Sequence, residues 1–365
     1  MDAEVGDRAR AASPALHMRK ETQGSRPRSG PEADAGDEPG LHRPSWAPHK
    51  MRYVLGVDGG GTKCDAVLMD ETGTVCGWGR GGSTHGLYVG RDVAAQSVRD
   101  AVQSAVTGRS VEVSRICGAG PFAALGDILN QELCSEMFVQ GGETGLGFAT
   151  ALTTHGILIL SGTGSFVFGL TEDGRHLHEG GNGPIVADEG SAYHIGILGM
   201  RAMFRSHYCE ARRTSLAQAV PKAMGVETQH EAFHQLYIDR IGRSQVAAVA
   251  KTVNDEAEKG DAVAIAVLQR AADELGELLV EVIRELRMQQ SEDYLVATGS
   301  VAQGSRIFWQ RLCEIAHSAA PGLRPIQPRV KPVIGACLLC LRDLGVQWSE
   351  NLLDHIVATQ GPFVA

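Results

Sequence analysis

The sequence has no long hydrophobic run and no excess of positive charge, and we expect no secretory leader. No stretch approaches the roughly 18 apolar residues that a membrane-spanning helix needs, which argues against such a helix. The 34 lysines and arginines are outnumbered by 43 aspartates and glutamates, and a formal net charge of −9 argues against broad nucleic-acid binding. The eight cysteines are scattered, which in a chain of 365 residues without a leader favours reduced thiols in a cytoplasmic protein.

Glycine is what the chain has in excess. It accounts for 45 of the 365 residues, which is about 12% against a usual share of roughly 7%. Much of this glycine lies in short clusters between apolar segments. At roughly 100–200 residues per domain the length predicts two domains, and the glycine clusters are the features that indicate what those domains do.

Residues 1–50 differ in composition from the rest of the chain. They contain six of the 14 prolines and few large apolar residues. Such a segment buries too little apolar surface to offset the entropy of ordering it. We therefore expect either a disordered tail or a mis-assigned start ahead of a true start at Met51.

The folded sequence opens with a strand, a glycine turn and a hairpin. Residues 52–58 and 65–69 predict two strands, and Gly59-Gly-Gly-Thr62 lies between them. Glycines let a backbone approach a ligand closely, and exposed N–H groups in such a turn form an anion nest. Asp58, at the strand end, would place a carboxylate where Mg²⁺ bridges phosphates. A plain hairpin with a capping Asp58 is the alternative, and the spacing matches neither a P-loop nor a dinucleotide fingerprint.

The same arrangement recurs about a hundred residues later. Residues 156–160 predict a strand, Ser161-Gly-Thr-Gly-Ser165 a second turn of small residues, and residues 166–170 the next strand. An internal repeat is stronger evidence than either turn alone. It predicts two similar half-molecules that each offer a phosphate-binding turn to one cleft, and a cleft between two lobes is a preferred ligand site.

Further motifs follow in order along the chain. The most distinctive is Asp188-Glu-Gly-Ser-Ala-Tyr193, ahead of a helical pattern. The others are Gly81–Thr84 after the first hairpin, Asn254–Asp261 opening a long helix, Thr298–Ser300 at a strand end and Pro332–Ala336 at the start of the last helix. Together with the two glycine turns, these motifs resemble the N-acetylglucosamine kinase and BadF/BadG/BcrA/BcrD ATPase group of the actin, hexokinase and Hsp70 superfamily, over residues 52–346.

The resemblance implies an α/β fold with two ribonuclease H-like lobes, a duplicated βββαβα unit, and an ATP and sugar cleft between them. The lobes are expected at residues 51–150 and 151–350, followed by a C-terminal tail at 351–365. A homodimer is compatible with the resemblance. The residues that it implies for ATP are Gly60, Gly61, Thr62, Lys63, Gly162, Thr163, Gly164, Ala247, Gly299 and Ser300.

The resemblance also implies phosphoryl transfer to a sugar hydroxyl, which is mainly a matter of positioning and charge stabilisation. Asp58 would organise Mg²⁺. The general base in these kinases is an Asp that lies 18 residues before the Ser-Gly-Thr-Gly-Ser turn, a position that Glu143 occupies in this chain. The residues implied for the sugar are His85, Ser165, Phe166, Gly181, Asn182, Gly183 and Asp188.

Two departures leave the sugar open. Glu143 has one more carbon in its stem than the Asp that it replaces, and His85 stands where the kinases carry an Asn. A site built for one set of hydroxyls discriminates against others. The expected activity is therefore ATP-dependent phosphorylation of an amino sugar similar to N-acetylglucosamine, and a non-enzymatic sugar sensor is one alternative.

A second alternative within the superfamily is an ATPase activator of a radical dehydratase. Those activators hold an iron–sulfur cluster with a Cys followed closely by Gly-Tyr-Gly, and the nearest segment here, Cys117-Gly-Ala-Gly, lacks the Tyr. The C-x-x-C pair at Cys337 and Cys340 lies in an apolar helical pattern, which favours core packing over metal binding. His194 is likewise expected to be a core or capping residue.

Overall fold

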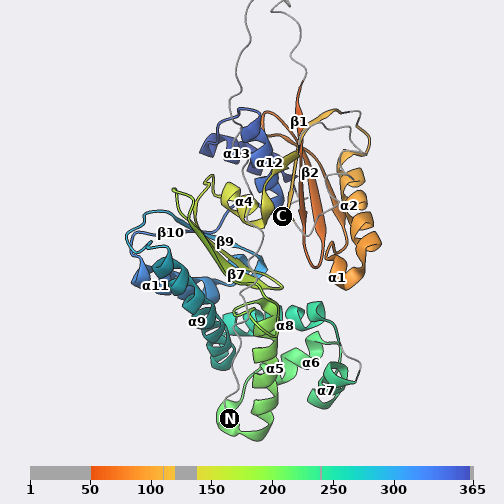
Figure 1. The fold of residues 1–365 in the computed structure, drawn as a ribbon. Coiled ribbons are helices and arrows are strands. Elements are labelled where there is room, and N and C mark those ends of the chain that lie inside the picture. Colours follow the sequence, from red (N-terminus) through yellow and green to blue (C-terminus); the bar gives the residue numbers. More distant parts are fainter. Residues whose placement is uncertain (1–50, 110, 120–137, 239–240, 362–365) are drawn as a thin grey trace, which may run out of the picture. The chain divides into compact units, whose positions relative to one another are not determined.

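The computed structural model describes residues 51–361 apart from 110, 120–137 and 239–240, and it shows two five-stranded mixed sheets with helices packed against them (Figure 1). The predictions for residues 1–50 lie outside the described residues. None of the helices in the described part is long and apolar enough to cross a membrane.

The first sheet has the strand order β3-β2-β1-β4-β5. Strand β1 is antiparallel to β2 and parallel to β4. Helix α2 packs on the face formed by Leu55 and Leu68. The strands are β1 (Tyr53–Gly59), β2 (Cys64–Asp70), β3 (Val75–Gly81), β4 (Val113–Ala119) and β5 (Phe138–Gln140), and the helices around them are α1 (Gly86–Val89), α2 (Arg91–Val106) and α4 (Gly142–Thr150).

The second sheet repeats this plan in the order β10-β9-β6-β7-β8. Strand β6 is antiparallel to β7 and parallel to β9, as β1 is to β2 and β4. The predicted duplication of a β-hairpin unit with a parallel extension is therefore confirmed, and the fold is of the actin and hexokinase type. The strands are β6 (Gly156–Ser161), β7 (Ser165–Leu170), β8 (His176–Gly180), β9 (Tyr294–Thr298) and β10 (Arg324–Ile326).

A set of helices between β8 and β10 forms the largest apolar core with the second sheet. The long helix α9 begins directly after the motif Asn254–Asp261, as predicted, and Asp261 caps it by accepting hydrogen bonds from the N–H groups of Val263 and Ala264. Asn254 lies inside the preceding helix. The helices are α5 (Ala192–Tyr208), η1 (Glu210–Arg212), α6 (Leu216–Ala223), α7 (Gln229–Tyr237), α8 (Arg243–Glu258), α9 (Ala262–Glu285), α10 (Ser300–Gly304) and α11 (Arg306–Ala319).

The C-terminal helices α12 (Pro332–Asp343) and α13 (Glu350–Thr359) belong to the core of the first sheet. Helix α12 packs against β1 and α4, and a Cβ on Gly335 would lie only 2.1 Å from the carbonyl oxygen of Leu146, so the two helices meet at a distance that only glycine permits. Cys337 and Cys340 are buried in this core. The lobe boundaries at residues 150 and 350 remain a prediction. Apolar residues between 330 and 356 pack in the core of the first sheet, although most of this segment was predicted to belong to the second lobe.

Candidate functional site

The two glycine turns of the repeat meet each other. The β1–β2 ladder ends at Gly59 and Cys64, and the β6–β7 ladder ends at Ser161 and Ser165, so each hairpin closes through a short turn of small residues. The hydroxyls of Thr62 and Thr163, one from each turn, lie 3.4 Å apart although 101 residues separate them in sequence. The structure thus brings together the two predicted phosphate-binding segments.

Two carboxylates lie beside these turns. Asp58 ends β1, and burial together with the nearby charges of Glu143 and Asp65 raises its pKa to about 7, against a smaller opposing effect of Lys63. Glu143 lies in the first turn of α4, where its side chain is open to solvent, yet desolvation by the surrounding protein raises its pKa as well. The predicted metal-binding and base residues are therefore close enough to repel each other, and both ionise reluctantly without a cation.

Lys63, which was predicted to contact ATP, is engaged inside the first hairpin. Its Nζ lies 2.7 Å from Oδ2 of Asp65, and Nε of Arg80 lies 2.6 Å from Oδ1 of the same carboxylate. Burial alone would raise the pKa of Asp65, but the hydrogen bonds from Arg80 and Lys63 outweigh it and lower the pKa. This buried anion with two cations stabilises the hairpin that carries the first turn.

The second turn is held by residues of the Asp188 motif. The Ser165 hydroxyl donates to the carbonyl of Glu189 at 2.7 Å, and its backbone N–H faces Oδ1 of Asp188 at 3.4 Å. Oδ2 of Asp188 accepts a hydrogen bond from Nη2 of Arg243, the first residue of α8. Burial raises the pKa of Asp188, with Arg243 acting in the opposite direction.

The other predicted sugar residues lie on the loop before Asp188 and on the first hairpin's exit. Gly181 and Gly183 have positive φ angles of 73° and 92°, and the loop they shape is closed by a bridge between Gly183 and Ala187. Asn182 donates its backbone N–H to Ala187 at 3.1 Å, and Phe166 is buried, with its ring centroid 4.6 Å from that of His178.

His85 is the residue immediately before the short helix α1, in its N-cap position. The residue before it, Thr84, is buried and donates its backbone N–H and its hydroxyl to the carbonyl of Gly60, at 3.0 and 3.2 Å. This contact fastens the segment that carries His85 directly to the first glycine turn.

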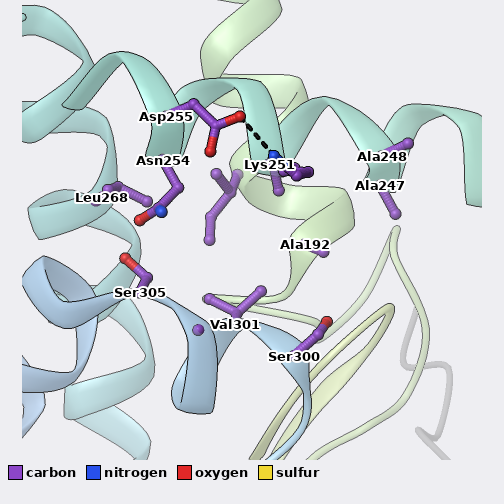
Figure 2. Close-up of a pocket in the computed structure, with 13 residues that line it drawn as sticks. Ala192, Ala247, Ala248, Lys251, Asn254, Asp255, Leu268, Ser300, Val301 and Ser305 are labelled. Carbon is purple, nitrogen blue, oxygen red and sulfur yellow. Dashed lines mark hydrogen bonds and ion pairs between the residues drawn. The ribbon is translucent and has the colours of Figure 1, made fainter. Parts of the chain in front are cut away.

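A cavity of about 430 Å³ lies next to the second turn (Figure 2). Figure 2 shows Ala247, Lys251 and Asn254 of α8 on one wall and Ser300 with Val301 of α10 on the other. This volume falls in the usual range of roughly 300–1,000 Å³ for small-molecule sites. The structure therefore brings together the predicted pair Ala247 and Ser300, which are distant in sequence.

Gly299 sets the distance between this cavity and the turn. Its φ angle is 86°, and a Cβ at this position would lie 2.4 Å from the carbonyl oxygen of Ser161. Both the backbone conformation and the close approach require glycine here. The end of β9 can therefore lie against the second turn, and Ser300, the next residue along the chain, lines the cavity beside it.

Three polar residues of this surface were not among the predicted site residues, namely Arg243, Lys251 and Asn254. A signal for them does exist in the sequence, because with Ala247 they recur at intervals of three or four residues, which places them on one face of a helix. The sequence does not show that this face of α8 lies beside the second turn, because that position depends on how the helix packs.

The comparisons with known proteins agree with this geometry. The family model for BadF/BadG/BcrA/BcrD ATPases matches residues 55–340, which is most of the chain. The chain belongs to this ATPase family. The match spans both glycine turns, the Asp188 motif and most of α12, so the family assignment rests on the same segments that build the site.

Distant relatives of this family member are named as sugar kinases. The chain is 24% identical over 316 residues to an N-acetyl-D-glucosamine kinase of Dictyostelium discoideum, covering 79% of this chain and 98% of the relative. It is 27% identical over 185 residues to an N-acetylmuramic acid/N-acetylglucosamine kinase of Clostridium acetobutylicum, covering 51% of this chain and only 60% of that relative's length. A solved structure from Porphyromonas gingivalis, described as a candidate N-acetylglucosamine kinase, aligns with a TM-score of 0.62 at 18% identity. The alignment covers 80% of this chain and 100% of that structure's chain, which shows that the two share a fold.

Proposed function

We propose that this protein is an ATP-dependent kinase that phosphorylates a hydroxyl of an amino sugar similar to N-acetylglucosamine. The observation that carries the proposal is the pair Asp58 and Glu143 beside two facing glycine turns. Phosphoryl transfer needs an anion cradle, a cation and a base for the accepting hydroxyl. The site offers residues for all three.

The turns would bind the nucleotide phosphates through their backbone N–H groups. Gly61 and Thr62 would do so from the first hairpin and Thr163 and Gly164 from the second, with the nucleoside in the cavity that Ala247 and Ser300 line. The N–H groups of Gly60 and Gly162 instead close the two turns, because they donate to the carbonyls of Lys63 and Gly164 at 2.8 and 2.9 Å. An acidic protein can bind an anion in this way because the positive potential is local to the turns.

The carboxylate of Asp58 fits a hard cation such as Mg²⁺. Its raised pKa shows that a charge there lacks compensation from the protein, and Mg²⁺ is typically held by one or two carboxylates, waters and substrate phosphates rather than by a full protein cage. In line with this, no cluster of three or more His, Cys, Asp or Glu able to hold a metal is found among the described residues. A bound Mg²⁺ would neutralise charge on the phosphates.

Glu143 would accept the proton of the attacking hydroxyl. As the new bond forms between the sugar oxygen and the γ-phosphorus, the bond from that phosphorus to ADP breaks, and the proton passes to the Glu143 carboxylate. A raised pKa suits this role, because a base is most effective when its pKa lies near the working pH. His85 and the loop that carries Gly181, Asn182 and Gly183 would surround the sugar, while Asp188, also predicted for the sugar, is engaged by Arg243 and Ser165.

The activator alternative is disfavoured by one observation. Cys117, the nearest match to the activators' cluster cysteine, is fully buried in β4, where it cannot reach a cluster shared with a second subunit. The sensor alternative differs from a kinase only in turnover, so it is decided by experiment.

We expect a coupled assay of ADP release, run over a panel of amino sugars that includes N-acetylglucosamine and N-acetylmuramic acid, to show turnover that depends on one sugar, ATP and Mg²⁺ together. The thermal unfolding midpoint measured with the same compounds is the control for binding. A sugar that raises the midpoint while no condition releases ADP would establish the sensor and contradict the kinase.

A further inference from the structure

Arg243 lies where the second glycine turn meets the first turn of α8. A Cβ built on Gly164 would be 2.9 Å from Nη2 of Arg243, the same nitrogen that donates to Asp188. The guanidinium group therefore lies directly against the backbone of the turn that we assign to the phosphates.

The carboxylate of Asp188 holds the side chain of Arg243 in this position. One of its oxygens accepts from Arg243 and the other faces the N–H of Ser165, and only 4% of its side chain is exposed. A carboxylate with both oxygens engaged is better placed to orient a neighbouring group than to bind a ligand itself.

The guanidinium group of Arg243 has hydrogen-bond donors that the described residues do not satisfy. Its Nε is buried without a hydrogen-bond partner among the described residues, and 26% of the side chain remains exposed. A buried donor left unpaired costs free energy, so the bonding of this guanidinium is incomplete in the ligand-free protein. Guanidinium groups with free donors are matched to oxyanions, which they bind through charge-assisted hydrogen bonds.

The position of Arg243 on α8 indicates how a bound nucleotide would lie along this helix. Arg243, Ala247, Lys251 and Asn254 share one helix face, and the last three line the cavity (Figure 2). At 1.5 Å per residue this face is about 16 Å long. One helix face therefore runs from the glycine turn to the far part of the cavity.

We propose that Arg243 binds the terminal phosphate group of the nucleotide and that Asp188 is its positioning residue. This rests on the proposed function, since it takes the cavity as the nucleoside site. It assigns to Arg243 the discrimination between a nucleoside triphosphate and a monophosphate, and it makes the contribution of Asp188 one that acts through Arg243.

The test is calorimetric binding of ATP and of AMP, without sugar, to the full-length protein and its variants. Arg243→Gln should weaken ATP binding by about tenfold or more, as expected for the loss of a charge-assisted phosphate contact, and AMP binding by less than about twofold. Arg243→Lys keeps the positive charge but loses the planar set of guanidinium N–H donors, and it should weaken ATP binding less than Arg243→Gln does. Lys259→Gln, an exposed cation at the far end of α8, should leave both affinities unchanged.

The role of Asp188 has its own signature. Asp188→Asn should weaken ATP binding selectively, and the double variant with Arg243→Gln should be no weaker than Arg243→Gln alone, because the two act as one unit. Additive losses would contradict the positioning role.

Equal weakening of ATP and AMP, or no weakening, in Arg243→Gln and Arg243→Lys would overturn the assignment of Arg243. If the variants still phosphorylate a sugar, the proposed function survives that result. If the unaltered protein binds no nucleotide at all, the proposed function fails together with this inference.

Discussion

Replacing Glu143 with Gln is expected to lower turnover by about 10²–10⁴-fold, the range usual for loss of a general base. The amide keeps the size and polarity of the side chain but cannot accept the hydroxyl proton. Because Glu143 acts on the accepting hydroxyl and the nucleotide cavity is lined by other residues, the KM for ATP should change little. Steady-state kinetics with the best sugar of the panel provide the measurement.

Two further variants separate this role from a general effect of charge. Glu143→Asp keeps a carboxylate on a stem one carbon shorter and should retain most of the turnover. Glu277→Gln removes an exposed carboxylate on α9 and should have no effect. Unchanged turnover in Glu143→Gln would remove Glu143 as the base and leave the accepting hydroxyl without a named partner.

Replacing Asp58 with Asn should have opposite effects on activity and on stability. Turnover should fall on the order of 10³-fold or more, since the site loses the carboxylate that would hold the Mg²⁺ neutralising the phosphate charge. The free energy of unfolding of the ligand-free protein should nevertheless rise above neutral pH, because the variant no longer carries a buried charge.

The sign follows from the pKa of Asp58, which folding raises from 3.8 to about 7. Below pH 3.8 the group is protonated in both states and contributes no penalty. Between pH 3.8 and 7 the unfolded chain releases the proton and the folded protein retains it, so stability is lost as pH rises, and the loss is complete above 7. At about 1.36 kcal/mol per pKa unit, the full penalty is about 4 kcal/mol.

Denaturant unfolding at pH 5 and pH 8, in chelator and without nucleotide, measures this effect. The difference in unfolding free energy between Asp58→Asn and the unaltered protein should be larger at pH 8. Asp92→Asn, at an exposed position on α2, serves as the control and should show no such pH dependence. A variant that is less stable at pH 8 would contradict the account of Asp58 as an uncompensated buried acid.

The hairpins and turns could be predicted from the sequence because their determinants are local. Apolar β-forming runs end in glycine at Gly59 and are followed by glycine again at Gly162. The repetition of that pattern makes it predictable that two sheets share the same hairpin arrangement. The contact between Thr62 and Thr163 follows from the duplication, since equivalent turns of two facing units approach each other.

Contacts that depend on packing between distant helices could not be predicted in this way. The pairing of Arg243 with Asp188 joins residues 55 positions apart, and nothing local to either side chain indicates the other. The apolar pattern of α12 predicts burial but does not say which sheet covers the helix. Its position against β1 depends on the close approach at Gly56, where a Cβ would lie 2.4 Å from the carbonyl oxygen of Val333.

Phosphorus NMR of a reaction containing the protein, ATP, Mg²⁺ and N-acetylglucosamine or N-acetylmuramic acid decides whether the phosphoryl group reaches a sugar. A sugar kinase gives the resonances of ADP together with a new phosphomonoester signal whose coupling to sugar protons identifies the phosphorylated hydroxyl, and we expect both to be absent with Glu143→Gln over the same period. ADP accompanied only by inorganic phosphate, for every sugar tested, would show an ATPase that transfers no phosphoryl group to sugar and would rule out the proposed kinase.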